Sequence, residues 1–502
     1  MAKIERGRLK EPLAPELMEV MIKPTITPTE VKRSYQTYLY INEAHVLMLL
    51  KQGIIKKDAA AKILKATAEM VAMGEEPDFP IVPELEEIYL NLENHLVGMV
   101  GIEAGGQQHT ARSRNDLHAC AERIDTRNAL LKFTHAVNTL RHTLIQTARE
   151  NKDAVMSGYT HLQPSEPITF AHYLSAISSA LTRDYTRLIR AWDATNLNPL
   201  GGGSMGSTTW PIDREMTTRL MGFDGIVQNS LDCVASRDYQ IEIMNALSLT
   251  ALTLNRVATD FRLWSAPEYG YIEVGDCISE CSSIMPQKKN AVTFECMTGA
   301  VSRVKGAGDI AWMTYKGIPY TFTIESTEIA RQLWAALEDT ENTVRLLDVS
   351  LKHMKIRKDR ARRAAASNFS TVTELANTLV RVEKISFREA HEIVAHLVAH
   401  LVETGKKPAD ITHDVLNEIG EPVLKRGLVI TDEEIHGALD PVKLANSKTV
   451  LGGTAPSEVE RQLRVVERAL CHDENQVLAY EDKLNAARAE TAKLAKKVFS
   501  EE

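Results

Sequence analysis

The sequence predicts a nearly all-α protein, and three observations lead to that expectation. Glycine and proline, which most often interrupt helices, are absent from four very long intervals. One of these intervals carries an apolar stripe with helical spacing. Strand signals are weak, because the β-branched stretches at 80–82 and 428–430 are too short to found a sheet.

The uninterrupted intervals cover residues 111–157, 168–198, 226–266 and 320–404. Helices in globular proteins average ~11–12 residues, so each interval has room for several helices or for a few very long ones. In the third interval the apolar residues step by three and four, at Met244, Leu247, Ala251, Leu254, Ala258 and Phe261. This spacing predicts a helix over 236–264, roughly 40 Å long, which needs equally long partners. We therefore expect a large bundle shared between subunits.

Composition places the chain among ordinary globular proteins. Of its 502 residues, 44% are hydrophobic and 25% are charged, which excludes a disordered chain, a collagen-like repeat and a disulfide-rich scaffold. With 59 basic and 67 acidic residues the net charge is −8, and no basic run offers a nucleic-acid surface. No apolar run approaches the ~18–20 residues of a membrane span, and the N-terminus lacks an apolar signal core. We expect a cytoplasmic protein without nucleic-acid or membrane partners.

Four irregular polar segments between the expected helices could carry chemistry, because function tends to sit on loops held by rigid elements. Segment 108–116 places two arginines, a serine, an asparagine and a histidine before a long helix, where anions are favoured. Solvated arginines at a helix cap would give the same pattern. Segment 158–167 keeps His161 outside a helix with two prolines, although a lone histidine is more often structural. Segment 452–456 is by itself a turn.

The fourth segment, 280–290, has the sharpest pattern. It offers two hydroxyls, at Ser282 and Ser283, followed by Lys288 and Asn290 at fixed spacing. Serine is a poor base and can act as one only where cations and amide dipoles stabilise its alkoxide. Lys288 and Asn290 could supply that field or hold a substrate carboxylate. A polar surface loop is the plain alternative.

Together these segments resemble the argininosuccinate lyase family of the aspartase/fumarase superfamily. The family pattern HTGRSRND is matched here by HTARSRND (109–116), GYTHLQPAQP by GYTHLQPSEP (158–167), and GSSxMPxKxN by CSSIMPQKKN (281–290). Further matches follow in family order up to about residue 456: NPLGGGSMGSTTWPIDRE, SRDY, FSTVTELAN, FREAH and GGTAP.

The resemblance implies a three-domain, mostly helical subunit. The expected ranges are an N-terminal helical domain at 1–110, a central long-helix bundle at 111–365 and a C-terminal helical domain at 366–502. It also implies a homotetramer whose central helices form one bundle, with each active site assembled from three subunits. Neither a metal nor an organic cofactor is expected.

The implied reaction is β-elimination from an N-substituted aspartate, which gives fumarate and a free amine. A base removes a proton beside a carboxylate, and the dianionic intermediate needs positive charge and hydrogen-bond donors nearby. An acid then helps the amine to leave.

By resemblance, Ser282 would be the base, and His161, paired with Glu295, would handle or orient a proton. Lys288 would stabilise the intermediate or hold its carboxylate. Serine, histidine and water all stay open as the general acid. The expected substrate-binding residues are Arg112, Ser113, Arg114, Asn115, Thr160, Gln163, Ser283, Met285 and Asn290.

Several positions depart from the family pattern. Cys281 replaces the signature glycine, Ala291-Val292 replaces a Pro-Asp pair, and Tyr89 stands where the family usually has a histidine.

The amine side of the site changes most. After Gly317 the family reads roughly GLPLAYNKDLQEDK, whereas this chain reads GIPYTFTIESTEIA. The family tyrosine, glutamine and last lysine, which hold the amino-acid end of arginine, thereby become Phe322, Thr327 and Ala330. An aspartate on the same side aligns loosely with Val31.

Each lost hydrogen bond is worth ~0.5–1.5 kcal/mol, so these changes predict a substrate other than argininosuccinate. The specific candidate is ethylenediamine-N,N'-disuccinate, which keeps the succinyl end and replaces arginine by a diamine bearing a second aspartate. The alternative is argininosuccinate itself. A non-catalytic, crystallin-like relative and a fumarase- or aspartase-type enzyme are lesser alternatives, and the HTARSRND and GGTAP segments disfavour the last.

Overall fold

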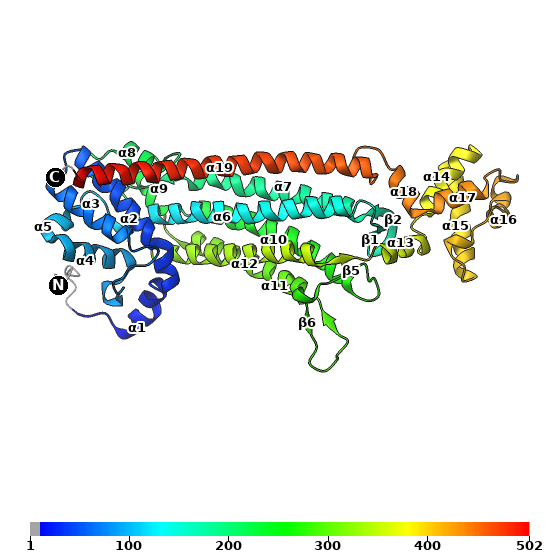
Figure 1. Ribbon diagram of the computed structural model, residues 1–502, viewed down its shortest axis with the longest axis horizontal. Helices are drawn as coiled ribbons and strands as arrows, with labels where there is room; N and C mark the ends of the chain where they lie inside the picture. Colours follow the sequence, from blue (N-terminus) through cyan, green and yellow to red (C-terminus); the bar gives the residue numbers. More distant parts are fainter. Residues whose placement is uncertain (1–10, 501–502) are drawn as a thin grey trace.

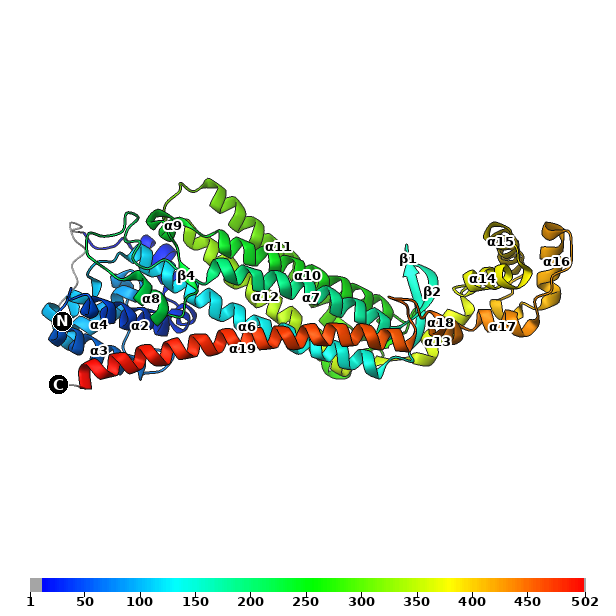
Figure 2. The ribbon, with the colours of Figure 1, turned by 90° about the horizontal axis from the view of Figure 1, so that it is seen from above.

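Long helices dominate the computed structural model, which describes residues 11–500 and has an elongated shape (Figures 1 and 2). Three hydrophobic cores follow one another along the long axis. The predicted all-α class is confirmed. Within the described residues no helix is both long and apolar enough to cross a membrane.

The N-terminal region is a compact group of helices around α2. Its helices are α1 (Pro15–Leu17), α2 (Pro28–Lys51), α3 (Lys57–Val71), α4 (Ile88–Val100) and α5 (Ile102–Gly105). Thr27 caps α2 by accepting a hydrogen bond from the backbone N–H of Glu30, and Pro28 occupies the first helical position. Val31, the residue aligned with a family aspartate, is buried in this core.

The central region is a bundle of long helices. They are α6 (Arg114–Glu150), α7 (Phe170–Thr195), α10 (Asp238–Ser265), α11 (Val292–Gly317) and α12 (Ser326–His353), with the short α8 (Arg214–Leu220) and α9 (Ser230–Ala235) at one end. Every member of the predicted stripe on α10 is buried, from Met244 to Phe261. The spacing of apolar residues therefore located this helix and its buried face correctly.

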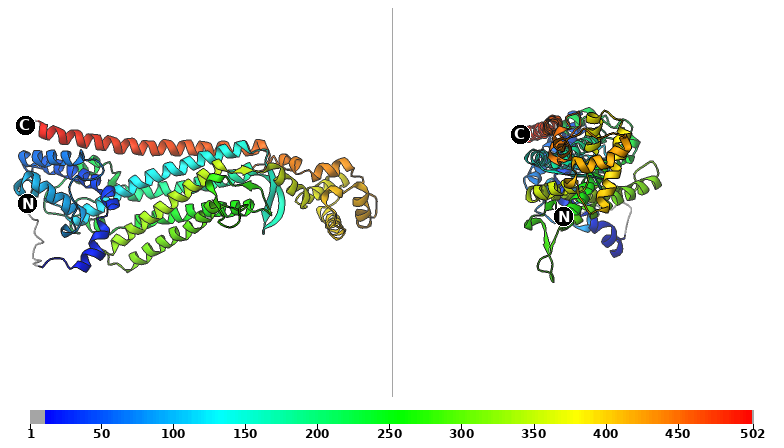
Figure 3. Two further views of the ribbon diagram at one scale, coloured as in Figure 1. Left: turned by 60° about the horizontal axis from the view of Figure 1, so that its bottom comes forward. Right: turned by 90° about the vertical axis from the view of Figure 1, so that its right-hand side faces the viewer.

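The C-terminal region begins with a small lobe and ends with a helix that leaves it. The lobe and its connection comprise α13 (Lys358–Ser367), α14 (Val372–Glu383), α15 (Phe387–Glu403), α16 (His413–Leu424), α17 (Asp432–Leu439) and α18 (Pro441–Ser447). From there α19 (Pro456–Ser500) runs back along the whole bundle (Figure 3). Leu463 packs in the central core and Ala495 in the N-terminal core. One helix thus joins all three regions, and the predicted domain boundaries stay a prediction.

Strands are short, and in residues 11–500 every sheet is two-stranded. They are β1 (Val155–Thr160) with β2 (Gln163–Thr169), β3 (Leu197–Asn198) with β4 (Gly225–Ile226), β5 (Ile272–Glu273) with β8 (Lys355–Ile356), and β6 (Glu280–Cys281) with β7 (Lys289–Asn290). The β1–β2 hairpin was expected as an irregular loop. Pro164 and Pro167 lie in β2 nonetheless, because both strands of a two-stranded sheet are edges, where a missing N–H is tolerated.

Candidate active site

Hydrogen bonds between side chains and backbone N–H groups of segment 108–116 fix its conformation at the start of α6. Ser113 caps the helix: its Oγ accepts from the N–H of Asn115 at 3.2 Å, and its own N–H donates to Asp116 Oδ1 at 2.9 Å. The other oxygen of Asp116 accepts from the N–H groups of Gly201 and Gly203 at 2.8 and 3.0 Å. Asp116 therefore ties the glycine-rich loop to the start of α6.

The two arginines of this segment point in different directions. Arg112 is 8% exposed, and its Nη2 donates to Asn42 Oδ1 at 2.7 Å and to the Tyr89 hydroxyl at 2.9 Å. The Arg114 side chain is 45% exposed, and its Nη1 lies 3.2 Å from Glu87 Oε1. Arg114 can reach a ligand at the surface, whereas the guanidinium of Arg112 is enclosed by protein.

The β1–β2 hairpin carries the second predicted segment at its tip. Thr160 pairs with Gln163, so His161 and Leu162 form a two-residue turn. Both turn residues have positive φ, 55° and 58°, a conformation that glycine, asparagine and aspartate adopt far more easily. All four side chains of the tip are exposed. The turn therefore holds His161 outward under backbone strain.

The β6–β7 hairpin presents segment 280–290 and projects from the side of the bundle (Figures 1 and 3). Ser282 Oγ accepts hydrogen bonds from the backbone N–H of Met285 at 3.0 Å and of Ile284 at 3.4 Å. Lys289 pairs with Asp276 at 2.5 Å, whereas Lys288 has no ion-pair partner among the described residues. Two backbone amides thus donate to the Ser282 hydroxyl, and Lys288 belongs to the same loop.

The rest of this loop is open to solvent. Ser283, Met285 and Lys288 are exposed, and Asn290 is partly exposed. Cys281, in place of the family glycine, is absent from the positive-φ residues, so its strand position does not require glycine. Glu295 is exposed in the first turn of α11.

One chain does not bring these segments together. The segment at Arg114 and the hairpin tip at His161 lie beyond opposite ends of α6, whose 37 residues span about 55 Å. Although both residues are described, no hydrogen bond joins His161 to Glu295. The predicted residues therefore form three separate groups on one subunit (Figure 1).

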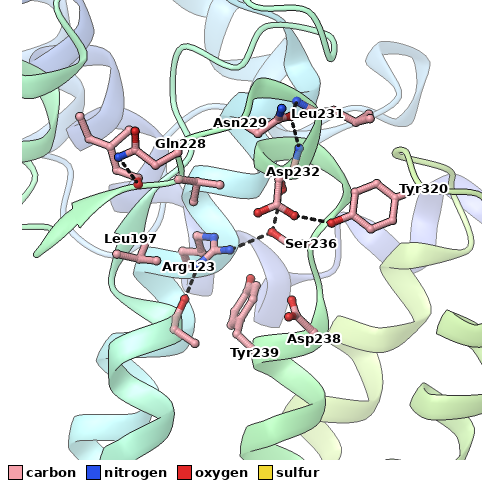
Figure 4. Close-up of a pocket in the computed structure, with 13 residues that line it drawn as sticks. Arg123, Leu197, Gln228, Asn229, Leu231, Asp232, Ser236, Asp238, Tyr239 and Tyr320 are labelled. Atoms are coloured by element: carbon pink, nitrogen blue, oxygen red, sulfur yellow. Dashed lines mark hydrogen bonds between the residues drawn. The ribbon is translucent and has the colours of Figure 1, made fainter.

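A cavity of about 630 Å³ opens beside the segment that differs most from the family (Figure 4). The Tyr320 hydroxyl donates to Asp232 Oδ1 at 2.7 Å, and Asp238 also lines the cavity. Neither carboxylate has a cationic partner among the described residues. Phe322 packs next to the cavity on the cluster of Val227, Cys233 and Val234.

Sequence reasoning did not find this cavity. Asp232 and Tyr320 are 88 residues apart and belong to no motif of charged residues, so their contact left no local signal. Within residues 11–500 no group of three or more His, Cys, Asp or Glu side chains is placed to hold a metal ion.

Comparison with known proteins decides the family. A family model described as "Lyase" matches residues 25–306, and one described as "Argininosuccinate lyase C-terminal" matches residues 369–446. The chain is 40% identical to argininosuccinate lyase 1 of Shouchella clausii, over 96% of each chain. It belongs to the argininosuccinate lyase family. The argininosuccinate lyase of Methanocaldococcus jannaschii is 35% identical, over 97% of this chain and 98% of the relative.

A solved structure resembles the chain throughout. EDDS lyase in complex with formate superposes with a TM-score of 0.86 at 29% identity, covering 98% of this chain and 97% of that one. A muconate lactonizing enzyme from Pseudomonas putida, at 19% identity and a TM-score of 0.70, shares the fold. Membership of the argininosuccinate lyase family confirms the predicted enzyme class, a fumarate-releasing carbon–nitrogen lyase.

Proposed function

We propose that this member of the argininosuccinate lyase family cleaves an N-substituted aspartate with Ser282 as the base. The observation that carries the proposal is the pair of backbone N–H groups that donate to Ser282 Oγ, at 3.0 and 3.4 Å. Lys288 follows six residues later in the same loop and has no ion-pair partner among the described residues. Amide dipoles and a cation stabilise an alkoxide, which is what a serine needs in order to accept a proton from carbon.

The remaining predicted residues divide the reaction between them. Ser282 takes the proton next to the carboxylate, and Lys288 and Asn290 stabilise the charge that develops there. Ser113, Arg114, Asn115 and Thr160 hold the succinyl carboxylates, with Gln163, Ser283 and Met285 around them. His161, oriented by Glu295 of another subunit, handles the proton at the amine end.

The site is completed in a homotetramer, in which three chains contribute one group each. The exposed apolar side chains of the central bundle support this assembly, because large apolar patches are rarely left in water. They lie on α10 and α11 and include Leu249, Leu252, Ile310, Trp312 and Met313. The predicted cytoplasmic location stays a prediction.

The amine half of the substrate occupies the cavity of Figure 4. Arg123 lines this cavity and lies eight residues, or about 12 Å, along α6 from Asn115. That distance suits a ligand whose succinyl end rests on Asn115. The free carboxylates of Asp232 and Asp238 suit an amine that carries a further positive charge.

Ethylenediamine-N,N'-disuccinate is the substrate that we favour. It carries a second protonated nitrogen two carbons from the one that leaves. Phe322, Thr327 and Ala330, which replace the family's arginine-side residues, remove the contacts that argininosuccinate would need. EDDS lyase, which aligns with the chain almost end to end, supports this choice.

Argininosuccinate is the second candidate. It is favoured by the relatives at 35–40% identity, which are argininosuccinate lyases. The α-ammonium group of arginine would also suit the two aspartates of the cavity.

One assay separates the two candidates. Fumarate release is followed by its ultraviolet absorbance with each substrate at equal concentration and enzyme. We expect kcat/KM for ethylenediamine-N,N'-disuccinate to exceed that for argininosuccinate at least tenfold, which corresponds to about 1.4 kcal/mol. The reverse ratio would assign the chain to argininosuccinate. Turnover of neither, together with no addition of any amine to fumarate, would favour a non-catalytic, crystallin-like relative.

The base is tested by Ser282→Ala. General-base catalysis contributes roughly 10²–10⁴-fold, so kcat should fall by that factor. Binding of fumarate, measured by calorimetry, should change little because the carboxylate ligands remain. Ser367→Ala, at an exposed position at the end of α13, is the control and should keep kcat within about threefold. Normal turnover by Ser282→Ala would remove Ser282 from the mechanism.

A further inference from the structure

The start of α4 lies against the segment that carries Arg112 and Arg114. Two side chains at this start, Glu87 and Tyr89, contact those arginines. Glu87, the residue before α4, has Arg114 Nη1 at 3.2 Å from Oε1 and His118 Nε2 at 2.7 Å from Oε2. Arg114 and His118 are one helical turn apart on α6. Glu87 therefore contacts both side chains on one face of that helix.

Chemistry fixes the direction of the hydrogen bond between His118 and Glu87. A carboxylate can only accept, so His118 Nε2 donates to Glu87. On the other side of the ring, the Tyr38 hydroxyl lies 2.8 Å from His118 Nδ1. Burial would raise the pKa of the Glu87 carboxyl, but hydrogen bonds and charges from His118 and Arg114 outweigh it and lower that pKa. Glu87 thus stays ionised.

Tyr89 holds the second arginine in the same turn. Its hydroxyl accepts from Arg112 Nη2 at 2.9 Å and lies 2.9 Å from His109 Nδ1. Burial and the nearby arginines lower the pKa of His109 to about 4, so this ring is neutral near pH 7. Its Nδ1 can then accept the Tyr89 proton. Arg112 is thereby held inside the protein through Nη2.

The difference between the two arginines follows from these contacts. Arg114 makes its described ion pairs through Nη1, to Glu87 at 3.2 Å and to Glu86 at 3.7 Å. Its Nε and Nη2 have no hydrogen-bond partner among the described residues, and its side chain is 45% exposed. One edge of the guanidinium is thus anchored, and the other edge is free to bind a carboxylate with two parallel hydrogen bonds.

We propose that Glu87 is a positioning residue, which anchors Arg114 through one nitrogen and aims its free edge at a carboxylate of the substrate. Tyr38 and His118 hold Glu87 in place, and Tyr89 holds Arg112 inside the protein. The proposal rests on the proposed function in one respect, namely that Arg114 binds the succinyl group.

The test is Glu87→Gln, which keeps the size of the side chain and removes its charge. The carbonyl of Gln can still accept from His118, so the fold is preserved. We expect the KM for the dicarboxylate substrate and the Kd of fumarate to rise about tenfold, with kcat within about threefold of the wild type, because a ligand arginine is misaligned while the base is untouched.

Glu86→Gln is the matched control. Glu86 is adjacent in sequence and approaches the same nitrogen at 3.7 Å, beyond hydrogen-bond distance. It should change neither KM nor Kd by more than about twofold. Tyr38→Phe removes the far end of the chain of contacts and should raise KM in the same direction as Glu87→Gln, by a smaller factor.

Four outcomes would overturn the proposal. Tighter fumarate binding by Glu87→Gln would show that Glu87 competes for Arg114 with the ligand. Equal effects of Glu87→Gln and Glu86→Gln would show a general effect of charge. An unchanged KM and Kd in Glu87→Gln, with an active wild type, would refute the positioning role of Glu87 and leave the proposed function standing. A wild type that neither binds fumarate nor turns over would refute the proposed function, and this proposal with it.

Discussion

The segment before α6 and the two exposed hairpins differ in how completely one chain builds them. Ser113 and Asp116 have their hydrogen bonds supplied by the same subunit, through the helix cap and glycine N–H groups, and Arg112 Nη2 is held by Asn42 and Tyr89. The tips at His161 and Ser282 project into solvent. The first region is preorganised before any ligand or partner arrives. The other two need something to close over them.

This difference explains why a single subunit shows no complete active site. A preorganised anion-binding segment costs little conformational entropy when a ligand binds. A loop in water, by contrast, leaves its catalytic groups fully hydrated, where electrostatic stabilisation is weak. Contact with neighbouring subunits would remove that water from both hairpins.

Exchange of subunits between two inactive variants tests this difference between the regions most directly. Arg114→Gln and His161→Asn should each lower kcat/KM by at least about 100-fold. After subunits of the two variants are exchanged by co-expression or refolding, some sites receive both intact segments from different chains. A random mixture should regain up to about a quarter of wild-type activity, because each segment is intact with a probability of about one half.

The control for this mixture is the double variant in a single chain, co-expressed with itself, which should stay inactive. Mixed tetramers that also stay inactive would mean that both segments of a site come from one chain. That result would contradict the separation of the two segments along α6.

The stability of the N-terminal region depends on pH through the contact of α6 with α2. Burial raises the pKa of Asp125 to about 7, although the hydroxyls of Thr37 and Ser34 donate to it. Because the folded pKa lies above the unfolded value, the stabilising contribution is fully present below about pH 4 and is lost as pH rises through about 7. As pH rises across that window, the free energy of unfolding of Asp125→Asn should increase by roughly 2–4 kcal/mol relative to that of the wild type.

Urea unfolding of both proteins at several pH values measures this gain. Asp359→Asn, at an exposed position on α13, is the control and should show the same pH dependence as the wild type. A constant difference between Asp125→Asn and the wild type at all pH values would mean that Asp125 does not titrate in this range.

The sequence located much of this structure, and the physical reason differs between elements. The stripe on α10 was predicted because helical burial repeats along the chain every three to four residues. The β1–β2 hairpin was missed because its turn, His161-Leu162, lacks the glycine or asparagine that signals such a turn. Contacts such as Tyr320 with Asp232 span 88 residues and follow from the fold alone. The separation of the three site segments likewise follows from the length of the helices between them, and the motifs carry no information on that distance.

The smallest expected effects come from two strained residues, one in each kind of region. Ala111 in the preorganised segment has φ 66°, and Leu162 at the hairpin tip has φ 58°. A left-handed conformation costs a non-glycine residue roughly 1–2 kcal/mol, and glycine offsets part of that gain by its greater freedom in the unfolded chain. Ala111→Gly and Leu162→Gly should each raise the free energy of unfolding by about 0.5–1 kcal/mol.

The two glycine variants should differ in catalytic activity. The neighbours of Ala111 are held by many hydrogen bonds, so Ala111→Gly should leave kcat and KM unchanged. The turn at Leu162 is held by its backbone alone, so Leu162→Gly should loosen His161 and lower kcat several-fold. Leu162→Ala, which shortens the side chain and keeps the strained φ, should give no gain in stability. Equal activity of both glycine variants would mean that strain at the tip plays no part in placing His161, and that its position is set entirely by the neighbouring subunit.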